Sequence, residues 1–154
     1  MKPEPERGSM HDFSRYIGAT YVGFKVKREA DIIVLGLGGC LKYNNGPNQF
    51  SQLQMWIMAI AKVPALLWNR VFRGRAVDIV LTHAPPSGIH DKEDRCHRGF
   101  KAFLWLMKVF QPRYLVHGHI HLYDSREERA TLVGSTTVLN AYGYQIIDTG
   151  DVHA

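Results

Sequence analysis

The chain has 154 residues, a length that suits one domain and argues against two. Hydrophobic residues make up 45% and charged residues 21%, a globular balance that excludes long disordered or fibrous segments. The formal net charge of +5 suits anionic ligands such as phosphates, but the basic residues are too few and too scattered to predict nucleic-acid binding. Only 14 acidic residues accompany 8 histidines, and this shortage of carboxylates bears on the site predicted below.

Cysteine usage and apolar stretches indicate the compartment. Cys40 and Cys96 do not form a CxxC pair and predict no disulfide framework, so a reduced, cytoplasmic setting is expected. The N-terminus lacks the apolar core of a secretory signal. The most apolar stretch, 53–68, contains Lys62 and Pro64 and is shorter than the roughly 20 residues of a membrane span. We therefore expect a buried helix there and no membrane partner.

The first half of the chain predicts two strands and a broken helix. Residues 21–27 alternate between apolar and polar, which is typical of a half-exposed strand. The β-branched run 31–35 is typical of a buried strand and is followed by a glycine-rich turn. Asn48 or Ser51 can cap the next helix, which Pro64 should kink or end before a second helical piece.

The second half alternates strand and helix and then clusters strands. Buried strands are predicted at 77–81 and 114–116, and apolar residues three and four apart predict an amphipathic helix over 100–110. Late strands are expected in three segments: 131–133, 136–140 and 144–147. The whole pattern predicts an α/β fold with a mixed β-sheet, a closing meander and flanking helices.

Histidines follow both buried strands of the second half. His83 comes after strand 77–81, and His117, His119 and His121 come after strand 114–116. Ligands of open α/β sheets bind beyond the carboxyl ends of strands. In an extended segment His119 and His121 would point the same way, and neutral imidazole is a common ligand of Zn, Mn, Fe and Ni. The clustering predicts a metal site, although packing is the favoured role for His117.

Two of these segments resemble a known family. Residues 80–86, VLTHAPP, and 118–121, GHIH, resemble the C-terminal half of the calcineurin-like metallophosphoesterases, and the resemblance spans roughly 20–148. It implies a four-layer αββα sandwich with two divalent metal ions (Mn, Fe, Zn or Ni) and hydrolysis of a phosphomonoester or phosphodiester by metal-activated water. It also implies a small-molecule or nucleotide phosphoester as substrate. The implied ligands are His83 and His119 for one metal and His121 for the other.

Three upstream motifs of that family are not intact in this chain. The family's D-x-H, G-D-x-x-D and G-N-H-D segments supply the bridging carboxylate and most ligands of the first metal. No G-D-x-x-D occurs here, and D-x-H occurs only at 151–153. The segment 7–12 resembles R-G-N-H-D with Asn replaced and one residue inserted, which implies His11 as the general acid and Asp12 as its orienting group. Two close dications without an anion between them repel each other.

We therefore expect a partial phosphoesterase domain that is half of a larger one. Its predicted bounds are a loose lead-in at 1–12, the partial domain at 13–150 and a tail at 151–154. A half sandwich leaves an apolar sheet face and edge open, so self-association or a complementing segment is expected.

Polar loops offer three candidate substrate contacts. Arg95 and His97 follow the Pro-Pro turn, where a guanidinium can bind phosphate in a fork. The favoured alternative for this loop is a solvated helix start capped by Asp94. Asn45 could reach a ligand from the loop after the glycine-rich turn, although such residues more often simply make turns.

Three functions stay open at this point. The first is a metal-dependent phosphoesterase whose missing motifs lie on another segment or chain. The second is a non-catalytic relic or binding domain that retains part of the metal site. The third is a single-metal hydrolase on His83, His119 and His121, because three histidines are a known ligand count for catalytic zinc.

Overall fold

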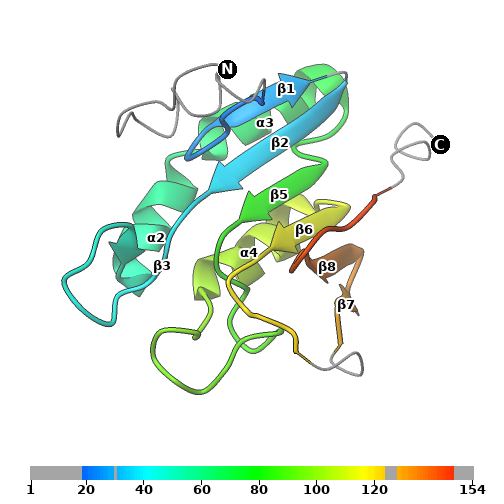
Figure 1. The fold of residues 1–154 in the computed structure, drawn as a ribbon. Coiled ribbons are helices and arrows are strands. Elements are labelled where there is room, and N and C mark those ends of the chain that lie inside the picture. The colour runs from blue at the N-terminus through cyan, green and yellow to red at the C-terminus, as the bar shows by residue number, and fades with distance from the viewer. Residues whose placement is uncertain (1–18, 30, 124–127, 148–154) are drawn as a thin grey trace, which may run out of the picture.

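The structure is a computed structural model that describes residues 19–29, 31–123 and 128–147. His11 and Asp12 lie outside these residues. The fold is built on a six-stranded sheet in the order β1-β2-β5-β6-β8-β7 (Figure 1). The strand bounds are β1 Val26–Glu29, β2 Ile32–Leu37, β5 Ile79–Thr82, β6 Tyr114–His117, β7 Ala130–Val133 and β8 Thr136–Asn140.

The sheet is mixed, as the sequence predicts. Strands β2, β5, β6 and β8 run parallel to one another, while β1 and β7 pair antiparallel at the two edges. A separate parallel pair of two-residue strands, β3 (Cys40–Leu41) and β4 (Gln49–Phe50), brackets the loop between them. The parallel arrangement places the carboxyl ends of β5 and β6 side by side, and the predicted histidines follow those ends.

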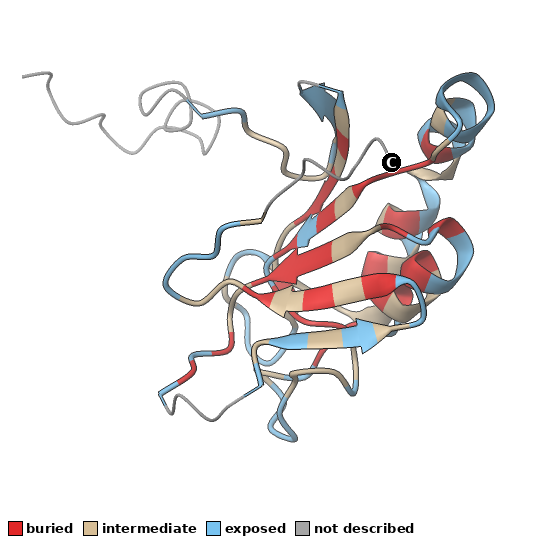
Figure 2. Cartoon of the chain, turned by 90° about the vertical axis from the view of Figure 1, so that its right-hand side faces the viewer, coloured by how far each residue is buried: buried red, intermediate tan, exposed pale blue. Residues whose placement is uncertain are grey.

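All three described helices lie on one face of the sheet (Figures 1 and 2). They are α2 (Gln52–Ile60), α3 (Val63–Arg73) and α4 (Lys101–Phe110). Strand side chains alternate between the two faces, and one alternating set is buried in the core together with residues of α2 and α4. That strand set is Leu35, Val80, Leu115 and Val138.

The opposite face of the sheet is only partly covered. Leu81 of β5 is 41% exposed, its cross-strand partner Val116 is buried, and four other neighbouring side chains on that face are of intermediate exposure. Those neighbours are Val34, Ile79, Thr137 and Leu139. An apolar sheet face therefore meets solvent in the part of the chain that the structure describes, as the sequence predicts for half of a sandwich.

Local sequence signals account for the helix ends. The Ser51 hydroxyl accepts a hydrogen bond from the Gln54 backbone N–H at 3.1 Å, and the Gln54 side chain accepts one from the Ser51 N–H at 2.8 Å. This capping box fixes the start of α2. Pro64 stands in the first turn of α3, where its missing N–H costs nothing. Gln111 ends α4 in the left-handed region, directly before Pro112.

One side chain joins α2 to α4. The Gln52 amide donates to the Gly99 carbonyl at 2.9 Å and accepts from the Lys101 N–H at 3.1 Å. The Trp56 and Trp105 rings pack 5.4 Å apart farther along the same two helices. These contacts position the start of α4, and with it the loop that precedes α4, against the start of α2.

Three sequence predictions need correction. The first strand begins at Val26 rather than in the region of residue 21, because the chain turns at 23–24 and Phe24 has a positive φ of 52°. Residues 144–147 form no strand: Tyr144 and Ile146 are 81% and 88% exposed and pair with no neighbouring strand among the described residues. The expected meander therefore ends at the β7–β8 pair.

The third correction concerns the apolar stretch predicted as a buried helix. The continuous stretch Gln52–Arg73, 22 residues, is the one described segment long and apolar enough to cross a membrane by length and composition alone. Only 17% of its most apolar window is buried, so it is not a core helix. Its side chains Met55, Ala59 and Leu66 are buried, and most of its other apolar groups meet solvent.

Candidate metal centre

Two histidines meet where β5 and β6 end. His83 directly follows β5 and His119 lies two residues after β6, and their ring centroids are 4.7 Å apart. Backbone hydrogen bonds tie the two segments together: the Gly118 N–H donates to the His83 carbonyl at 3.1 Å. Burial and the nearby His119 lower the pKa of His83, which keeps this imidazole neutral at neutral pH. A neutral ring offers the lone pair that a metal ion needs.

A tight turn presents His119. Its φ is +64°, and the Ile120 N–H donates to the Gly118 carbonyl at 2.7 Å, which makes a three-residue γ-turn centred on His119. The positive-φ form of this turn is rare and strained, and such strain concentrates at functional sites. The segment is therefore not extended, and the expectation that His119 and His121 point the same way for that reason is wrong.

The second nitrogen of His119 has a backbone partner. His119 Nε2 lies 2.7 Å from the carbonyl oxygen of Cys96, an atom that can only accept. In the neutral ring the proton therefore sits on Nε2, and Nδ1 carries the lone pair. Fixing the tautomer of a ligating histidine through its other nitrogen is the usual arrangement in metal sites.

The loop before α4 brings a further cluster to the same place. The donor atoms of Asp94, Cys96 and His97 lie within 4.8 Å of one another, and the His97 ring is 5.2 Å from that of His119. The Cys96 thiol donates to Asp94 Oδ1 at 2.8 Å, and His97 Nδ1 lies 2.8 Å from the same oxygen. These hydrogen bonds hold the pKa of Asp94 well below its usual range, and Asp94 raises the pKa of the Cys96 thiol.

This cluster changes the prediction made for the loop. Asp94 does not cap α4, because that helix begins at Lys101 with Phe100 at its N-cap. The Asp94 carboxylate instead binds the loop's own thiol, imidazole and backbone N–H. Sulfur, nitrogen and oxygen donors within this reach suit a borderline metal such as zinc. Arg95 is exposed in the same loop.

His121 stands apart from the pair. Its side chain is exposed, its ring stacks on Tyr142 at 4.7 Å and 27°, and its Nδ1 lies 3.1 Å from the Tyr123 hydroxyl. Among the described residues, its ring contacts are with these two tyrosines and not with His83 or His119. The structure thus groups two of the three predicted ligands and leaves the third beside an aromatic platform that the sequence did not suggest.

A second histidine pair lies buried next to the site. His117 is 1% exposed, and its Nε2 lies 2.9 Å from His90 Nδ1, while the other nitrogen of His90 lies 2.8 Å from the Thr131 hydroxyl. Burial is the main cause that lowers the pKa of His117 to about 4; the His90 and His119 charges lower it further, and the Gly118 carbonyl opposes them. The predicted packing role of His117 is confirmed. No spacing in the sequence pointed to His90 as its partner.

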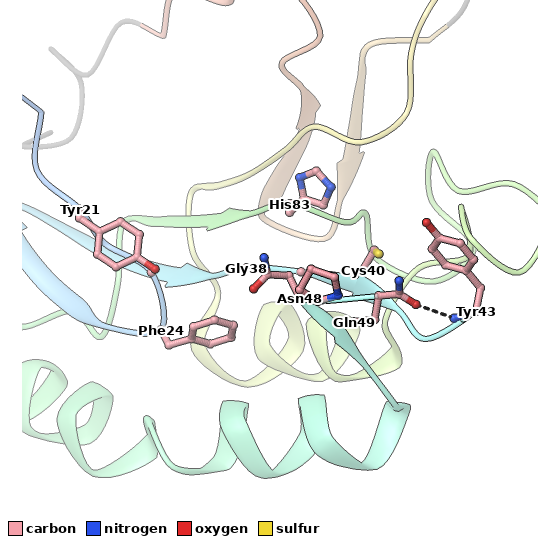
Figure 3. A pocket seen from close by; sticks show the side chains of 11 residues that line it. Tyr21, Phe24, Gly38, Cys40, Tyr43, Asn48, Gln49 and His83 are labelled. Carbon is pink, nitrogen blue, oxygen red and sulfur yellow. Dashed lines mark hydrogen bonds between the residues drawn. The ribbon is translucent and has the colours of Figure 1, made fainter. Parts of the chain in front are cut away.

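His83 also lines a cavity of about 390 Å³ (Figure 3). The other walls come from the segment before β1, from the end of β2 and from the β3–β4 pair: Tyr21, Gly23, Phe24, Gly38, Gly39, Cys40, Tyr43, Pro47, Asn48 and Gln49. Gln49 Oε1 accepts from the Tyr43 and Asn44 N–H groups at 3.0 Å each, which holds the loop in place. Asn45 is exposed and does not line the cavity, whereas Asn48 does. The positive φ of Asn48 sets it at the turn into β4.

Comparisons with known proteins identify the family and the fold. A family model described as calcineurin-like phosphoesterase matches residues 12–123. A solved crystal structure aligns with 84% of this chain at 18% identity and a TM-score of 0.56, a likeness of fold alone. The protein TT1561 of Thermus thermophilus aligns with 79% at 15% identity and a TM-score of 0.49. The chain spans about half the length of these two proteins, 48% of each. None of the curated proteins compared gives a significant match.

Proposed function

The chain belongs to the calcineurin-like phosphoesterase family, and we propose that it takes part in metal-dependent hydrolysis of a phosphoester. The observation that supports the proposal most directly is the His83–His119 pair, with rings 4.7 Å apart at the carboxyl ends of two adjoining parallel strands. Two imidazoles from separate strand ends, one of them in a strained turn, are more than packing requires.

The residues present fit a divalent metal ion at this pair. His83 is neutral because burial lowers its pKa, and the Cys96 carbonyl fixes the His119 tautomer that leaves Nδ1 available. Asp94 and His97, beside His119, add a carboxylate and an imidazole. Such donors suit Mn, Fe, Zn or Ni. When bound, the metal would supply a hydroxide near neutral pH and neutralise charge on the phosphoryl oxygens.

The other polar groups would hold the substrate. The cavity beside His83 offers the Asn48 amide and the Tyr43 ring, which suit the organic part of a small-molecule or nucleotide phosphoester. Arg95, exposed in the loop of His97, would bind the phosphate through its guanidinium. His121, on its tyrosine platform, would serve a second metal ion once a carboxylate from elsewhere bridges the two.

The test combines metal counting with hydrolysis. The purified chain is dialysed against Mn²⁺ or Zn²⁺, its metal content is measured, and turnover of an aryl phosphodiester is followed. His119→Asn removes the imidazole while keeping a residue type that tolerates positive φ, so metal and turnover should both be lost with the fold intact. Gln111→Asn introduces the same residue type at another positive-φ position and is the matched control. Turnover that survives His119→Asn would contradict the assignment.

One observation favours a second candidate, a binding domain that keeps part of the site. His121 does not join His83 and His119, so the described residues bring together ligands for one metal rather than two. The metal content separates the candidates. About two metals per chain would contradict the binding domain, whereas one metal with turnover would favour a single-metal hydrolase. One metal without turnover would favour binding alone.

A further inference from the structure

The exposed side of the α2–α3 segment carries a regular apolar seam. Ala61 and Lys62, between the two helices, keep helical torsions (φ −60°, ψ −15° and φ −91°, ψ −12°). The Leu66 N–H donates to the Lys62 carbonyl at 3.1 Å, so the helical period continues from α2 into α3. On that period, exposed apolar side chains recur at intervals of four, three, four, three and four residues. The members of this seam are Leu53, Ile57, Ile60, Pro64, Leu67 and Val71.

Alternating intervals of four and three residues are the pattern of a coiled-coil contact. An average repeat of 3.5 residues keeps the apolar side chains directed at a partner helix along the whole contact. The buried side chains Met55, Ala59 and Leu66 lie on the opposite side of the segment, in the core. The seam therefore faces away from the sheet and is separate from the open sheet face (Figure 2). The occupant that this spacing suits is another helix.

The seam itself carries no charge. No Asp, Glu, Lys or Arg occupies any of its positions, and Lys62, Arg70 and Arg73 lie nearer the buried side on the same helical period. Arg70 is the closest of the three to the seam. In an antiparallel pair it would face Gln54 of a second copy, so the two arginines would lie about 24 Å apart along the segment. That separation exceeds the screening length at physiological salt, so two copies can meet here without strong repulsion.

The seam also matches its own reverse. A two-fold axis requires a surface that is complementary to a second copy of itself. With two segments antiparallel and the axis at the level of Lys62, every seam position faces an apolar seam position. The pairs are Leu53 with Val71, Ile57 with Leu67 and Ile60 with Pro64.

The exposed area is large enough for a stable dimer. Trp68 and Phe72 flank the seam, are 61% and 64% exposed, and pack their rings 4.1 Å apart. Together with the seam they expose roughly 800 Å² per copy, about what each partner of a standard stable interface contributes. A soluble domain rarely leaves this much contiguous apolar surface without an occupant.

We propose that two copies of the chain pair through α2–α3 as an antiparallel, two-fold helix pair. A second copy is the occupant because the seam is uncharged, matches its own reverse and has the area of a dimer interface. The self-association expected from the sequence concerned the open sheet face, whereas this contact lies on the helix-covered side of the sheet. It involves neither His83 nor His119 and stands independently of the proposed function.

Analytical ultracentrifugation of the whole chain tests the proposal, and we expect a dimer at micromolar concentration. Leu53→Glu sets a carboxylate against the apolar Val71, and Val71→Lys sets an ammonium group against Leu53. Each change alone should weaken dimerisation at least about tenfold. In a mixture of the two variants, one contact joins opposite charges and the other joins the unchanged Leu53 and Val71. The dimer should therefore return in the mixture.

Matched controls change exposed leucines outside the seam. Leu132 on β7 is 71% exposed, close to the 69% of Leu53, and Leu132→Glu should leave the dimer unchanged. Leu81→Thr, on the open sheet face, should leave it unchanged as well. Far-ultraviolet circular dichroism checks that each variant is folded.

Four results would overturn the proposal. They are a monomeric unmodified chain, a dimer that survives both seam variants, a dimer lost in either control, and a mixture of the seam variants that stays monomeric. A monomer that co-sediments with phosphatidylcholine vesicles would identify a membrane as the occupant instead of a second copy.

Discussion

Two pairs of histidines lie at the same end of the sheet, and their surroundings differ. In the His83–His119 pair the ring centroids are 4.7 Å apart and the ring planes are tilted by 58°, and His119 fixes one nitrogen on a backbone carbonyl while its other nitrogen stays available. In the His90–His117 pair the two rings bond each other at 2.9 Å, and the remaining nitrogens reach the Thr131 hydroxyl and the Gly118 carbonyl.

The difference separates a ligand from a structural group. A histidine whose nitrogens are both engaged by the protein has no lone pair to give, however close it lies to a metal site. A histidine with one engaged nitrogen is both oriented and available. All four histidines lie at or near the end of a strand, so that position alone does not distinguish a ligand from a structural group.

The first prediction tests this difference directly. His83→Ala should weaken Zn²⁺ or Mn²⁺ affinity by about a hundredfold, since it removes one of the two paired donors. His90→Ala should change the affinity by less than about threefold. Competition with a fluorescent chelator measures both. Equal losses in the two variants would erase the distinction between the pairs.

The buried pair should instead control stability in acid. The pKa of His117 is about 4 in the folded chain, below the ordinary 6.5, so the unfolded chain takes up this proton first as the pH falls. The contribution of His117 to the free energy of unfolding is then fully present above pH 6.5, and about 3 kcal/mol of it is lost as the pH falls toward 4. Urea unfolding in the presence of a chelator across this range measures the decrease. His117→Gln should flatten the profile; an unchanged slope would assign the acid sensitivity to other groups.

A smaller effect is expected at the far end of the buried pair. Thr131→Val removes the partner of His90 Nε2 and should lower the free energy of unfolding by about 1 kcal/mol, with metal affinity unchanged. Thr137→Val, at a partly exposed position of β8, is the control and should be close to neutral. Thermal unfolding compares the two. A loss of metal affinity in Thr131→Val would show that the pairs are coupled.

The smallest effect concerns the loop that flanks His119. Asp94 raises the pKa of the Cys96 thiol, so Asp94→Asn should increase the thiolate fraction and speed alkylation by iodoacetamide about threefold near pH 8. Cys40 is buried and serves as the internal control. Bound metal should slow the alkylation of Cys96 in the unmodified chain. An unchanged rate in Asp94→Asn would contradict the hydrogen-bonded cluster.

The periodicity of apolar residues and the residues that begin or end helices predict most of the fold. Short apolar runs located β2, β5 and β6. Ser51, Pro64 and Pro112 set helix limits because each acts on the backbone of its immediate neighbours. The strand predicted at 144–147 failed because a strand needs a partner, and pairing is a property of distant segments.

The helix α2–α3 shows another limit. Its sequence repeats apolar residues on both sides, so periodicity identifies two faces without saying which one the sheet covers. Leu66 turns inward while Trp68 turns outward, two residues away. The tertiary contacts decide this, and the sequence alone led to the wrong expectation of burial.

In the site, too, local sequence signals predicted some features and tertiary contacts determined the others. Strand-end position was enough to single out His83 and His119, since parallel strands bring their ends to one edge. It was not enough to place His121, because the positive φ of His119 redirects the chain within a single residue. The cluster of Asp94, Cys96 and His97 depends on the path of a loop, which no local signal specifies.

The Gln52 side chain connects the α2–α3 segment mechanically to the loop before α4. Its amide fastens the first residue of a helical arm about 33 Å long to both sides of Phe100, at the base of the loop that holds His97. The position of that loop is therefore fixed by its contact with the arm as well as by the strand before it. A load applied along the arm reaches the start of α4 through this amide and through the Trp56–Trp105 contact, so both contacts hold the loop of His97 in place.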